Sequence, residues 1–286
     1  MSKIKIGDVV ARKSYGMDVY FKVVDIKSSS KEESATLKGI SHRIYVDAPI
    51  SDLVVIPKDR LDAYKRHENM VIEEKHRGVM QKNDRWRKRG FRNTSKDARE
   101  FKRPGKILHL DGDEDYMKTC LKEYEKSDIE AHGRYVPEKD QPSVIFKHLA
   151  DVRPDIVVLT GHDSVKKGDE NYNDIKNYHN SAYFVEAVKE CRRYEPDMDG
   201  LVIFAGACQS MYKDILGAGA NFASAPYRVL IHTLDPVLVA EKVALTQANI
   251  MLAPKTVISN TITGVDGIGG LLTRGKYREG FPKEPY

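Results

Sequence analysis

Cysteine is scarce in this chain of 286 residues, and the scarcity argues against several kinds of site. The three cysteines, Cys120, Cys191 and Cys208, are widely spaced and form no Cys-x-x-Cys pair. An odd number at such spacings favours neither a zinc site nor a disulfide framework. In a reducing compartment we expect three free thiols. We expect neither a metal nor an organic cofactor.

Long apolar runs are also missing. A membrane-spanning helix needs about 20 apolar residues in succession, and no stretch of the chain approaches that length. The opening segment, MSKIKIGDVV, contains no apolar core followed by a small-residue cleavage site, so it does not resemble a secretory signal. These absences predict a cytosolic protein that does not bind membranes.

Charge is abundant but unevenly distributed. Residues 75–106 carry 13 Lys and Arg against 3 Asp and Glu, whereas residues 107–286 carry 21 against 27. Residues 1–74 are close to neutral. The pattern predicts a near-neutral head, a basic connector and an acidic body.

The head, residues 1–56, has the pattern of a small β domain. Apolar strands alternate with turns at Gly7 and Gly16, and further strands are separated by Gly39 and Pro49. Short strands at close spacing are typical of a small barrel. The opening Gly-Asp-x-Val turn resembles that of SH3-like β-barrels, so we expect a docking or folding module, whose ligand the sequence does not specify.

The connector, residues 57–105, is expected to be helical first and then basic and flexible. Apolar residues recur at helical spacing from Leu61 to Val71, and a run rich in arginine and lysine follows. Three interpretations of the basic run remain open. It could be a solvated linker, a processing site, or a nucleic-acid contact in which Trp86 and Phe91 stack on bases.

The body, residues 106–286, alternates strands with helices. The pattern predicts strands at 106–110, 155–160, 201–206 and 227–234, and helices at 114–127, 143–152, 181–194 and 236–251. This alternation is typical of an α/β fold with a mostly parallel sheet flanked by helices. The continuously apolar runs IVVL and LVIF suit central strands that are buried on both faces.

Two of these strands end in reactive side chains. His162 follows the strand at 155–160, and Cys208 follows the strand at 201–206. Reactive groups gather beyond the carboxyl ends of parallel strands, and consecutive strands joined by one helix are often neighbours. A thiol is mostly protonated at neutral pH, and a nearby histidine can take its proton. We therefore predict that Cys208 attacks a carbonyl carbon and that His162 is its base and later protonates the departing amine.

A packed thiol is the alternative interpretation of Cys208. Cysteine is among the most frequently buried residues, and the small residues around Cys208 could be the packed end of a strand. Cys120 and Cys191 lie between apolar residues on helices, and we expect them to be ordinary core or surface thiols. His109 is a competing base, which we expect to be a core histidine.

The motifs LTGHD, at 159–163, and FAGACQS, at 204–210, resemble a known class. A strand ending in Gly-His, followed 46 residues later by Ala-Cys, resembles the caspase–legumain–clostripain class of cysteine peptidases. Over its whole length the chain is similar to the YabG family of sporulation-specific proteases. The resemblance implies a caspase-like body with Cys208 as nucleophile and His162 as base. It also implies action on spore-coat and related proteins, in the cytoplasm of the sporulating mother cell or at the spore coat.

One feature departs from the peptidase class, in which the histidine is usually followed by glycine. Here Gly161 precedes His162, and Asp163 follows it. The backbone N–H groups of Asp163 and Cys208 are the donors that we expect to stabilise the oxyanion. The carboxylate of Asp163 is expected to orient His162 or to receive a cationic substrate side chain.

The resemblance further implies cleavage after arginine, and an acidic body suits a cationic partner. An arginine pocket needs a carboxylate placed for bidentate contact. Asp235 and Asp163 are the candidates, and Ser224 is a candidate for the pocket wall. Asp235 could equally be a helix N-cap before Pro236.

If arginine is preferred, the connector is itself a substrate, because exposed flexible segments are readily cut. We therefore predict self-cleavage within residues 85–105. The arginines concerned are Arg85, Arg87, Arg89, Arg92, Arg99 and Arg103.

Two non-enzymatic functions compete with the peptidase. A receiver-like regulatory domain would suit the β/α alternation and could use Asp111 or Asp113, but it has no use for the motif around Cys208. A nucleic-acid-binding protein built on the head and connector would bind in a salt-sensitive manner and would tolerate Cys208→Ala. We favour the peptidase, with proteins rather than nucleic acid as its partners, and make no prediction of the oligomeric state.

Overall fold

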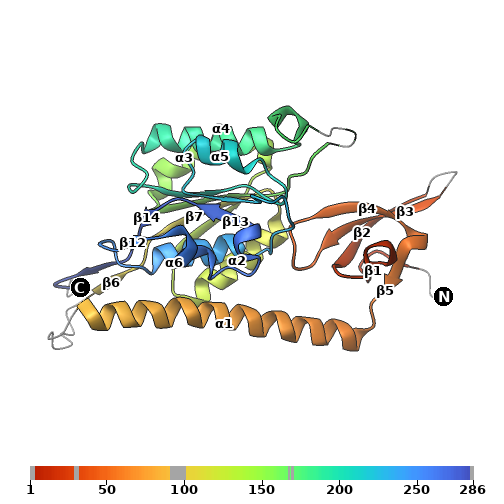
Figure 1. Cartoon of the computed structure of the whole chain (residues 1–286), viewed down its shortest axis with the longest axis horizontal. Coiled ribbons are helices and arrows are strands. Elements are labelled where there is room, and N and C mark those ends of the chain that lie inside the picture. Colours follow the sequence, from red (N-terminus) through yellow and green to blue (C-terminus); the bar gives the residue numbers. More distant parts are fainter. Residues whose placement is uncertain (1–3, 29–31, 91–100, 167, 169–170, 284–286) are drawn as a thin grey trace. The chain divides into compact units, whose positions relative to one another are not determined.

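A computed structural model describes residues 4–28, 32–90, 101–166, 168 and 171–283 of the chain, without the side chains of residues 80–90. The chain forms two compact units, Met1–Glu73 and Glu74–Tyr286. Helix α1, Lys58–Gly90, begins in the first unit and ends in the second (Figure 1).

The first unit is a five-stranded antiparallel sheet in the order β4-β3-β2-β1-β5. Its apolar residues, including Val10, Val23 and Leu37, form a small core of their own. A shift in register between Val23 and Asp25 marks a bulge, which bends β2. The strands are β1 Val9–Arg12, β2 Tyr20–Ser28, β3 Glu33–Gly39, β4 Tyr45–Pro49 and β5 Leu53–Val55. The head is therefore an antiparallel β unit, and its SH3-like character remains a prediction.

The second unit is built on a six-stranded sheet in the order β13-β11-β10-β9-β7-β8. The strands from β11 to β8 pair in parallel, and β13 pairs antiparallel with β11. The strands are β7 Ile107–Asp111, β8 Ala131–Tyr135, β9 Ile156–Thr160, β10 Val202–Ala205, β11 Phe222–Ser224 and β13 Ile268–Gly270. Smaller pairs join β12 Met251–Leu252 with β14 Thr273–Arg274, and β15 Arg278–Gly280 with β6 Phe101–Arg103. The predicted α/β class with a mostly parallel sheet is confirmed.

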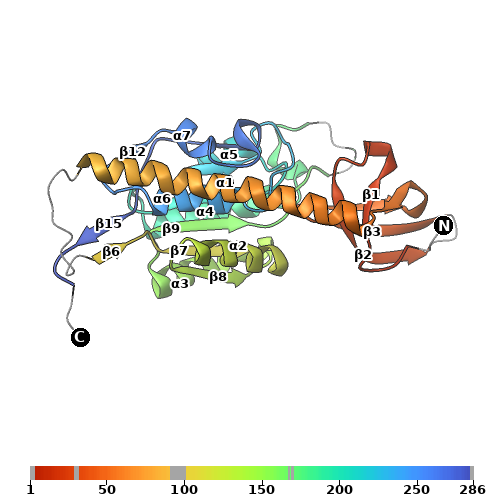
Figure 2. The same ribbon diagram turned by 90° about the horizontal axis from the view of Figure 1, so that it is seen from below.

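Helices cover both faces of this sheet (Figures 1 and 2). On one face α3, α4 and α5 pack through Ile145, Phe184 and Ile215, which belong to the large apolar core. On the other face lie α2 and α6. The helices are α2 Glu114–Lys126, α3 Gln141–Val152, α4 Ser181–Tyr194, α5 Tyr212–Gly217, α6 Asp235–Ala244 and α7 Pro254–Ile258. None of the helices that the structure describes is long and apolar enough to cross a membrane.

The connector differs from its prediction, because α1 continues to Gly90 through much of the basic run. Lysine, arginine and glutamine are good helix formers, and the run contains no proline before Pro104. Of the arginines predicted to be cut, Arg85, Arg87 and Arg89 therefore lie in a helix rather than a flexible segment, and Arg103 lies in strand β6. Arg92 and Arg99 lie outside the described residues.

Residues 227–234, predicted as a strand, form an irregular segment instead, with turns at its ends and one isolated bridge residue, His232. Ala225 and Arg228 have φ angles of 63° and 54°, in the left-handed region, and they divert the chain from an extended path. The place beside β10 is taken by β11. Apolar residues of the segment, among them Ile231, are buried by tertiary packing rather than within the sheet, so the apolar pattern was compatible with either structure.

Candidate active site

The loops that carry His162 and Cys208 leave neighbouring strands at the same edge of the sheet. Strands β9 and β10 are parallel, with Leu159 opposite Ala205. The backbone N–H of Gly206 donates to the carbonyl oxygen of Leu159 at 3.0 Å, which extends the pairing to the start of the second loop. His162 follows β9 by two residues, and Cys208 follows β10 by three. This is the arrangement of strands that the sequence predicted.

Cys208 lies in a tight turn and is only 1% exposed. Gly206 and Gln209 both have positive φ angles, 109° and 62°, and produce the turn. The Sγ atom accepts the backbone N–H of Ile231 at 3.2 Å. An N–H directed at sulfur stabilises negative charge on it. Cys191 differs, because its burial in α4 raises the pKa of its thiol to about 12, as expected of a core thiol.

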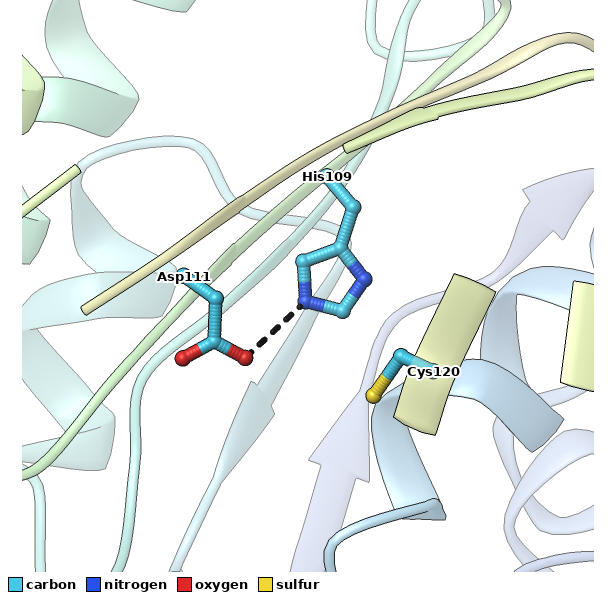
Figure 3. A group of neighbouring side chains, drawn as sticks. All are labelled: His109, Asp111 and Cys120. Atoms are coloured by element: carbon cyan, nitrogen blue, oxygen red, sulfur yellow. Dashed lines mark ion pairs between the residues drawn. The ribbon is translucent and has the colours of Figure 1, made fainter. Parts of the chain in front are cut away.

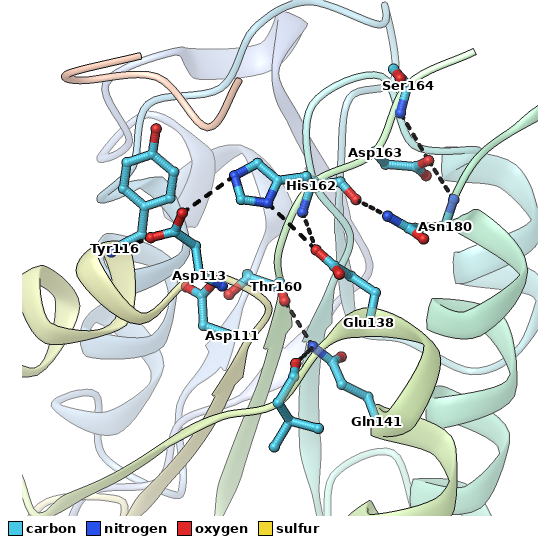
Figure 4. Close-up of polar contacts among 12 residues, drawn as sticks. Asp111, Asp113, Tyr116, Glu138, Gln141, Thr160, His162, Asp163, Ser164 and Asn180 are labelled. Carbon is cyan, nitrogen blue, oxygen red and sulfur yellow. Dashed lines mark hydrogen bonds and ion pairs between the residues drawn. The ribbon is translucent and has the colours of Figure 1, made fainter. Parts of the chain in front are cut away.

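His162 lies between two carboxylates (Figure 4). Its Nδ1 is 3.6 Å from an oxygen of Glu138, and its Nε2 is 3.7 Å from an oxygen of Asp113. The ring of Tyr116 lies beside the imidazole, with 5.7 Å between the ring centroids. The amide of Asn180 donates to the carbonyl oxygen of His162 at 2.8 Å. The imidazole, 23% exposed, is thus surrounded by polar groups that can accept or share a proton.

Glu138 occupies a space that two glycines leave open. A Cβ atom at Gly112 would lie 2.2 Å from the Oε1 atom of Glu138, and a Cβ at Gly161 would lie 2.1 Å from the same atom. Either distance is shorter than non-bonded atoms tolerate. The Gly161 that departs from the usual peptidase pattern therefore has a steric reason here, because it admits the Glu138 carboxylate next to His162.

Asp163 holds the two loops together. Its carboxylate accepts the backbone N–H groups of Ser164 and Asn180, and the hydroxyls of Ser181 and Ser210. Burial raises the pKa of the carboxyl, and the hydrogen bonds from these groups partly offset that effect. Because Asp163 is 7% exposed and satisfied by four donors, the structure argues against its expected roles of orienting His162 or receiving an arginine. Its backbone N–H remains a predicted oxyanion donor.

Asp235 is likewise engaged inside the protein. Its carboxylate accepts the backbone N–H groups of His232 and Ile262, at 3.0 and 2.7 Å, and the hydroxyl of Thr263. It lies in the first turn of α6 rather than at the N-cap, which is Leu234. Asp235 is therefore neither the predicted pocket carboxylate nor the predicted N-cap. It connects the segment around His232 to the loop around Thr263 by hydrogen bonds.

Ser224 also faces inward. It is fully buried at the end of β11, and its hydroxyl donates to the carbonyl oxygen of Ala207 at 3.0 Å. This bond fixes the residue before Cys208. Ser224 therefore supports the turn that carries the thiol. We had expected it to line the wall of the substrate pocket.

His109, Asp111 and Cys120 are buried together near this edge (Figure 3). In the part of the chain that the structure describes, they are the one group of three metal-ligating side chains whose ligand atoms lie within 4.8 Å of one another. The ring nitrogens of His109 lie 2.8 Å from the hydroxyl of Thr160 and 3.2 Å from that of Tyr124. These bonds make His109 a core histidine, as expected, and the group is an internal polar network between β7 and α2.

Glu138 and Asp113 are the site residues that sequence reasoning missed as partners of His162. Asp113 follows β7, and its other carboxylate oxygen caps α2 by accepting the N–H groups of Asp115 and Tyr116. Its position after a strand was a usable signal. Glu138 follows β8, an edge strand with exposed and half-buried residues whose pattern did not predict a strand.

Comparison with known proteins agrees with this architecture. Residues 5–282 match the YabG peptidase family, U57. The chain is 41% identical over 288 residues to the sporulation-specific protease YabG of Bacillus subtilis (strain 168), and the match covers 98% of each chain. A match of this length and identity includes both units and the loops at the edge of the sheet. The chain therefore belongs to the YabG family of peptidases and is a protease.

Proposed function

We propose that this chain is a cysteine endopeptidase of sporulation, with Cys208 as its nucleophile and His162 as its general base. The observation that carries the proposal is the position of the two side chains on loops that leave neighbouring parallel strands at one edge. The Cys208 sulfur accepts the N–H of Ile231 at 3.2 Å and donates to its carbonyl oxygen at 3.9 Å, which supports the proposal by holding the thiol in one position.

The reaction follows from these groups. Cys208 gives its thiol proton to His162, and the sulfur bonds to the peptide carbonyl carbon while the C=O electron pair moves to oxygen. Backbone N–H groups of Asp163 and Cys208 stabilise that oxyanion. Collapse breaks the C–N bond, and His162 protonates the departing amine. A water molecule that His162 deprotonates then hydrolyses the thioester and restores the thiol.

Substrate access requires movement of residues 227–234. Cys208 is 1% exposed, and Ile231 of this segment contacts its sulfur. The segment is irregular and belongs to none of the strands of the six-stranded sheet, so its movement does not require the sheet to open. We propose that substrate binding displaces it and exposes the thiol.

Spore-coat and related proteins are the proposed substrates, cut after arginine, in the mother cell or at the coat. The relative's name supports a role in sporulation, and the acidic charge of residues 107–286 supports a cationic substrate. Asp163 and Asp235 are both engaged in internal hydrogen bonds, so neither supports the arginine preference.

Self-cleavage in the connector remains part of the proposal, with its positions ranked by local structure. Cleavage after Arg85, Arg87 or Arg89 would require the end of α1 to unwind, and cleavage after Arg103 would require β6 to separate from β15. A peptidase binds its substrate as an extended, unpaired segment. Unwinding the helix or separating the strands therefore adds a free-energy cost to cleavage at these four arginines. Arg92 and Arg99 lie outside the described residues.

The first experiment compares wild type, Cys208→Ala and Cys191→Ala. Each protein is followed without added substrate by intact-mass analysis and is then given a fluorogenic arginyl peptide amide. We expect Cys208→Ala to lose at least about 10⁴-fold in kcat/KM, and Cys191→Ala, which removes a buried thiol from α4, to retain activity. Equal activity in wild type and Cys208→Ala would show that Cys208 is an ordinary buried thiol and not the nucleophile.

The two non-enzymatic alternatives make different predictions. In a receiver-like regulator the aspartates after β7 would accept phosphate, but Asp111 is fully buried and pairs with His109, and Asp113 caps α2. Nucleic-acid binding through the connector would be salt-sensitive and would survive Cys208→Ala. The same pair of proteins tests both.

A further inference from the structure

Glu138 contacts His162 at two places through a single oxygen. Its Oε1 accepts the backbone N–H of His162 at 2.6 Å and lies 3.6 Å from the ring Nδ1. The first contact is a short hydrogen bond that fixes the main chain of the loop. The second is longer than a hydrogen bond, and catalytic hydrogen bonds often tighten only in the enzyme–substrate complex.

The carboxylate of Glu138 is itself held in place. Its side chain is 13% exposed. The short 3-10 helix Glu138–Asp140 follows a tight link to β7, in which the N–H of Val136 donates to the carbonyl oxygen of Asp111 at 2.9 Å. Gly112 and Gly161 leave room for its Oε1 atom and for no added carbon. A group confined in this way can fix the orientation of the imidazole.

The second carboxylate beside His162 differs in what it does. Asp113 uses its other oxygen to cap α2, whereas Glu138 accepts the backbone N–H of His162. Glu138 thus contacts both the ring and the backbone of His162. Its position on the Nδ1 side makes Nε2, which faces Asp113 at 3.7 Å, the atom that our mechanism needs for proton exchange.

We propose that Glu138 is a positioning residue of the peptidase, which holds His162 in the tautomer and orientation that the reaction needs. The inference rests on the proposed function of Cys208 and His162. With Nδ1–H directed at Glu138, the imidazole presents its Nε2 lone pair to the thiol proton. When His162 becomes an imidazolium, the Glu138 carboxylate stabilises its positive charge. Glu138 acts through His162 and does not touch the substrate.

The test compares Glu138→Gln and Glu138→Ala with wild type, Cys208→Ala and Glu123→Gln. The glutamine variant keeps an oxygen for the His162 N–H and removes only the charge, so it should fold. Glu123 is a matched control, because it is a buried carboxylate paired with another histidine, His76, at the far end of α2. kcat and KM are measured with a fluorogenic arginyl peptide amide, and the rate of Cys208 alkylation by iodoacetamide is measured by mass spectrometry.

We expect Glu138→Gln to lose about 10- to 100-fold in kcat with KM unchanged within about twofold. Its Cys208 should alkylate more slowly at pH 7, while its thermal unfolding midpoint stays near that of wild type. Glu138→Ala should lose at least as much, and Glu123→Gln should keep kcat. A merely structural role would lower the unfolding midpoint without slowing the turnover of folded enzyme.

The outcomes separate the inference from the function on which it rests. If Cys208→Ala is inactive but Glu138→Gln keeps wild-type kcat and alkylation rate, the inference is overturned and the peptidase stands. If wild type cleaves nothing and its Cys208 alkylates no faster than Cys191, the proposed function fails and the inference fails with it.

Discussion

Two histidines of the second unit each lie between two carboxylates, but their contacts differ. His76 of α1 is 3.2 Å from Glu123 and 2.9 Å from Glu241. His162 keeps carboxylates at 3.6 and 3.7 Å. Both side chains are similarly exposed, 17% and 23%. The first arrangement is closed and fastens α1 to α2 and α6. The second is looser, as the proposed role of His162 as a base requires.

The charge of the closed histidine follows from its contacts. Burial disfavours the charged imidazole of His76, but the hydrogen bonds to Glu123 and Glu241 outweigh it and raise its pKa to about 9. The pKa of Glu241 is raised in turn by its burial. At neutral pH His76 is therefore a fixed cation in a structural ion pair. The comparison teaches that one histidine and two carboxylates can form either a closed ion pair or a looser arrangement, and that the residue types alone do not distinguish them.

Exchanging each histidine for alanine gives the largest expected contrast. His162→Ala should lose at least about 10³-fold in kcat with little change in the free energy of unfolding. His76→Ala should keep kcat but lower the free energy of unfolding by about 3 kcal/mol, since it leaves two carboxylates near each other without their cation. Peptide cleavage and urea unfolding measure the two effects. Equal loss of activity in both folded variants would break the comparison.

The pH dependence of stability tests whether His76 forms a charged ion pair. Because the pKa of His76 is about 9 in the folded protein against 6.5 for an ordinary histidine, its contribution is fully present below pH 6.5. It is lost as the pH rises through 9. We expect the difference in unfolding free energy between wild type and His76→Ala to shrink by at least about 1 kcal/mol from pH 6 to pH 9.5. A difference that grows with pH would contradict the ion pair.

Gly161→Ala should give the smallest effect. It tests whether the Glu138 carboxylate must lie in the space beside Gly161. The added Cβ would lie 2.1 Å from Oε1 of Glu138, so the carboxylate must move away from His162. We expect kcat to fall about tenfold, since small displacements in a catalytic group are costly. Gly217→Ala, whose Cβ would meet no atom within 4 Å, is the control. Unchanged turnover in Gly161→Ala would show that Glu138 need not be held there.

The fold was predicted most successfully where local pattern and burial agree. The helix at 181–194 and the strands ending near His162 and Cys208 follow from apolar periodicity, because they are buried in the sheet or pack directly on it. The strand expected at 227–234 was wrong, because its apolar residues Ile231 and Leu234 are buried by the packing of an irregular segment. Strand β8 was missed because an edge strand has no continuous apolar run.

The candidate site shows the same division. Cys208 and His162 could be named because thiol and imidazole carry recognisable chemistry at the ends of consecutive strands. Asp163 and Asp235 were given substrate roles for the same reason, and the structure binds both into internal hydrogen bonds instead. An aspartate in the sequence does not reveal whether its carboxylate faces a substrate or accepts hydrogen bonds inside the protein. The sequence therefore could not distinguish the two roles.

By itself the sequence determined the α/β class, the strands that precede His162 and Cys208, and the placement of these two side chains after neighbouring strands. Periodicity and residue chemistry are local, and local information suffices for these. Only the tertiary structure decided that Glu138 lies against His162, that Asp163 joins the two loops, and that Ile231 covers the thiol. Those contacts join residues 17 to 47 positions apart, and only the packing of the whole unit brings such residues together.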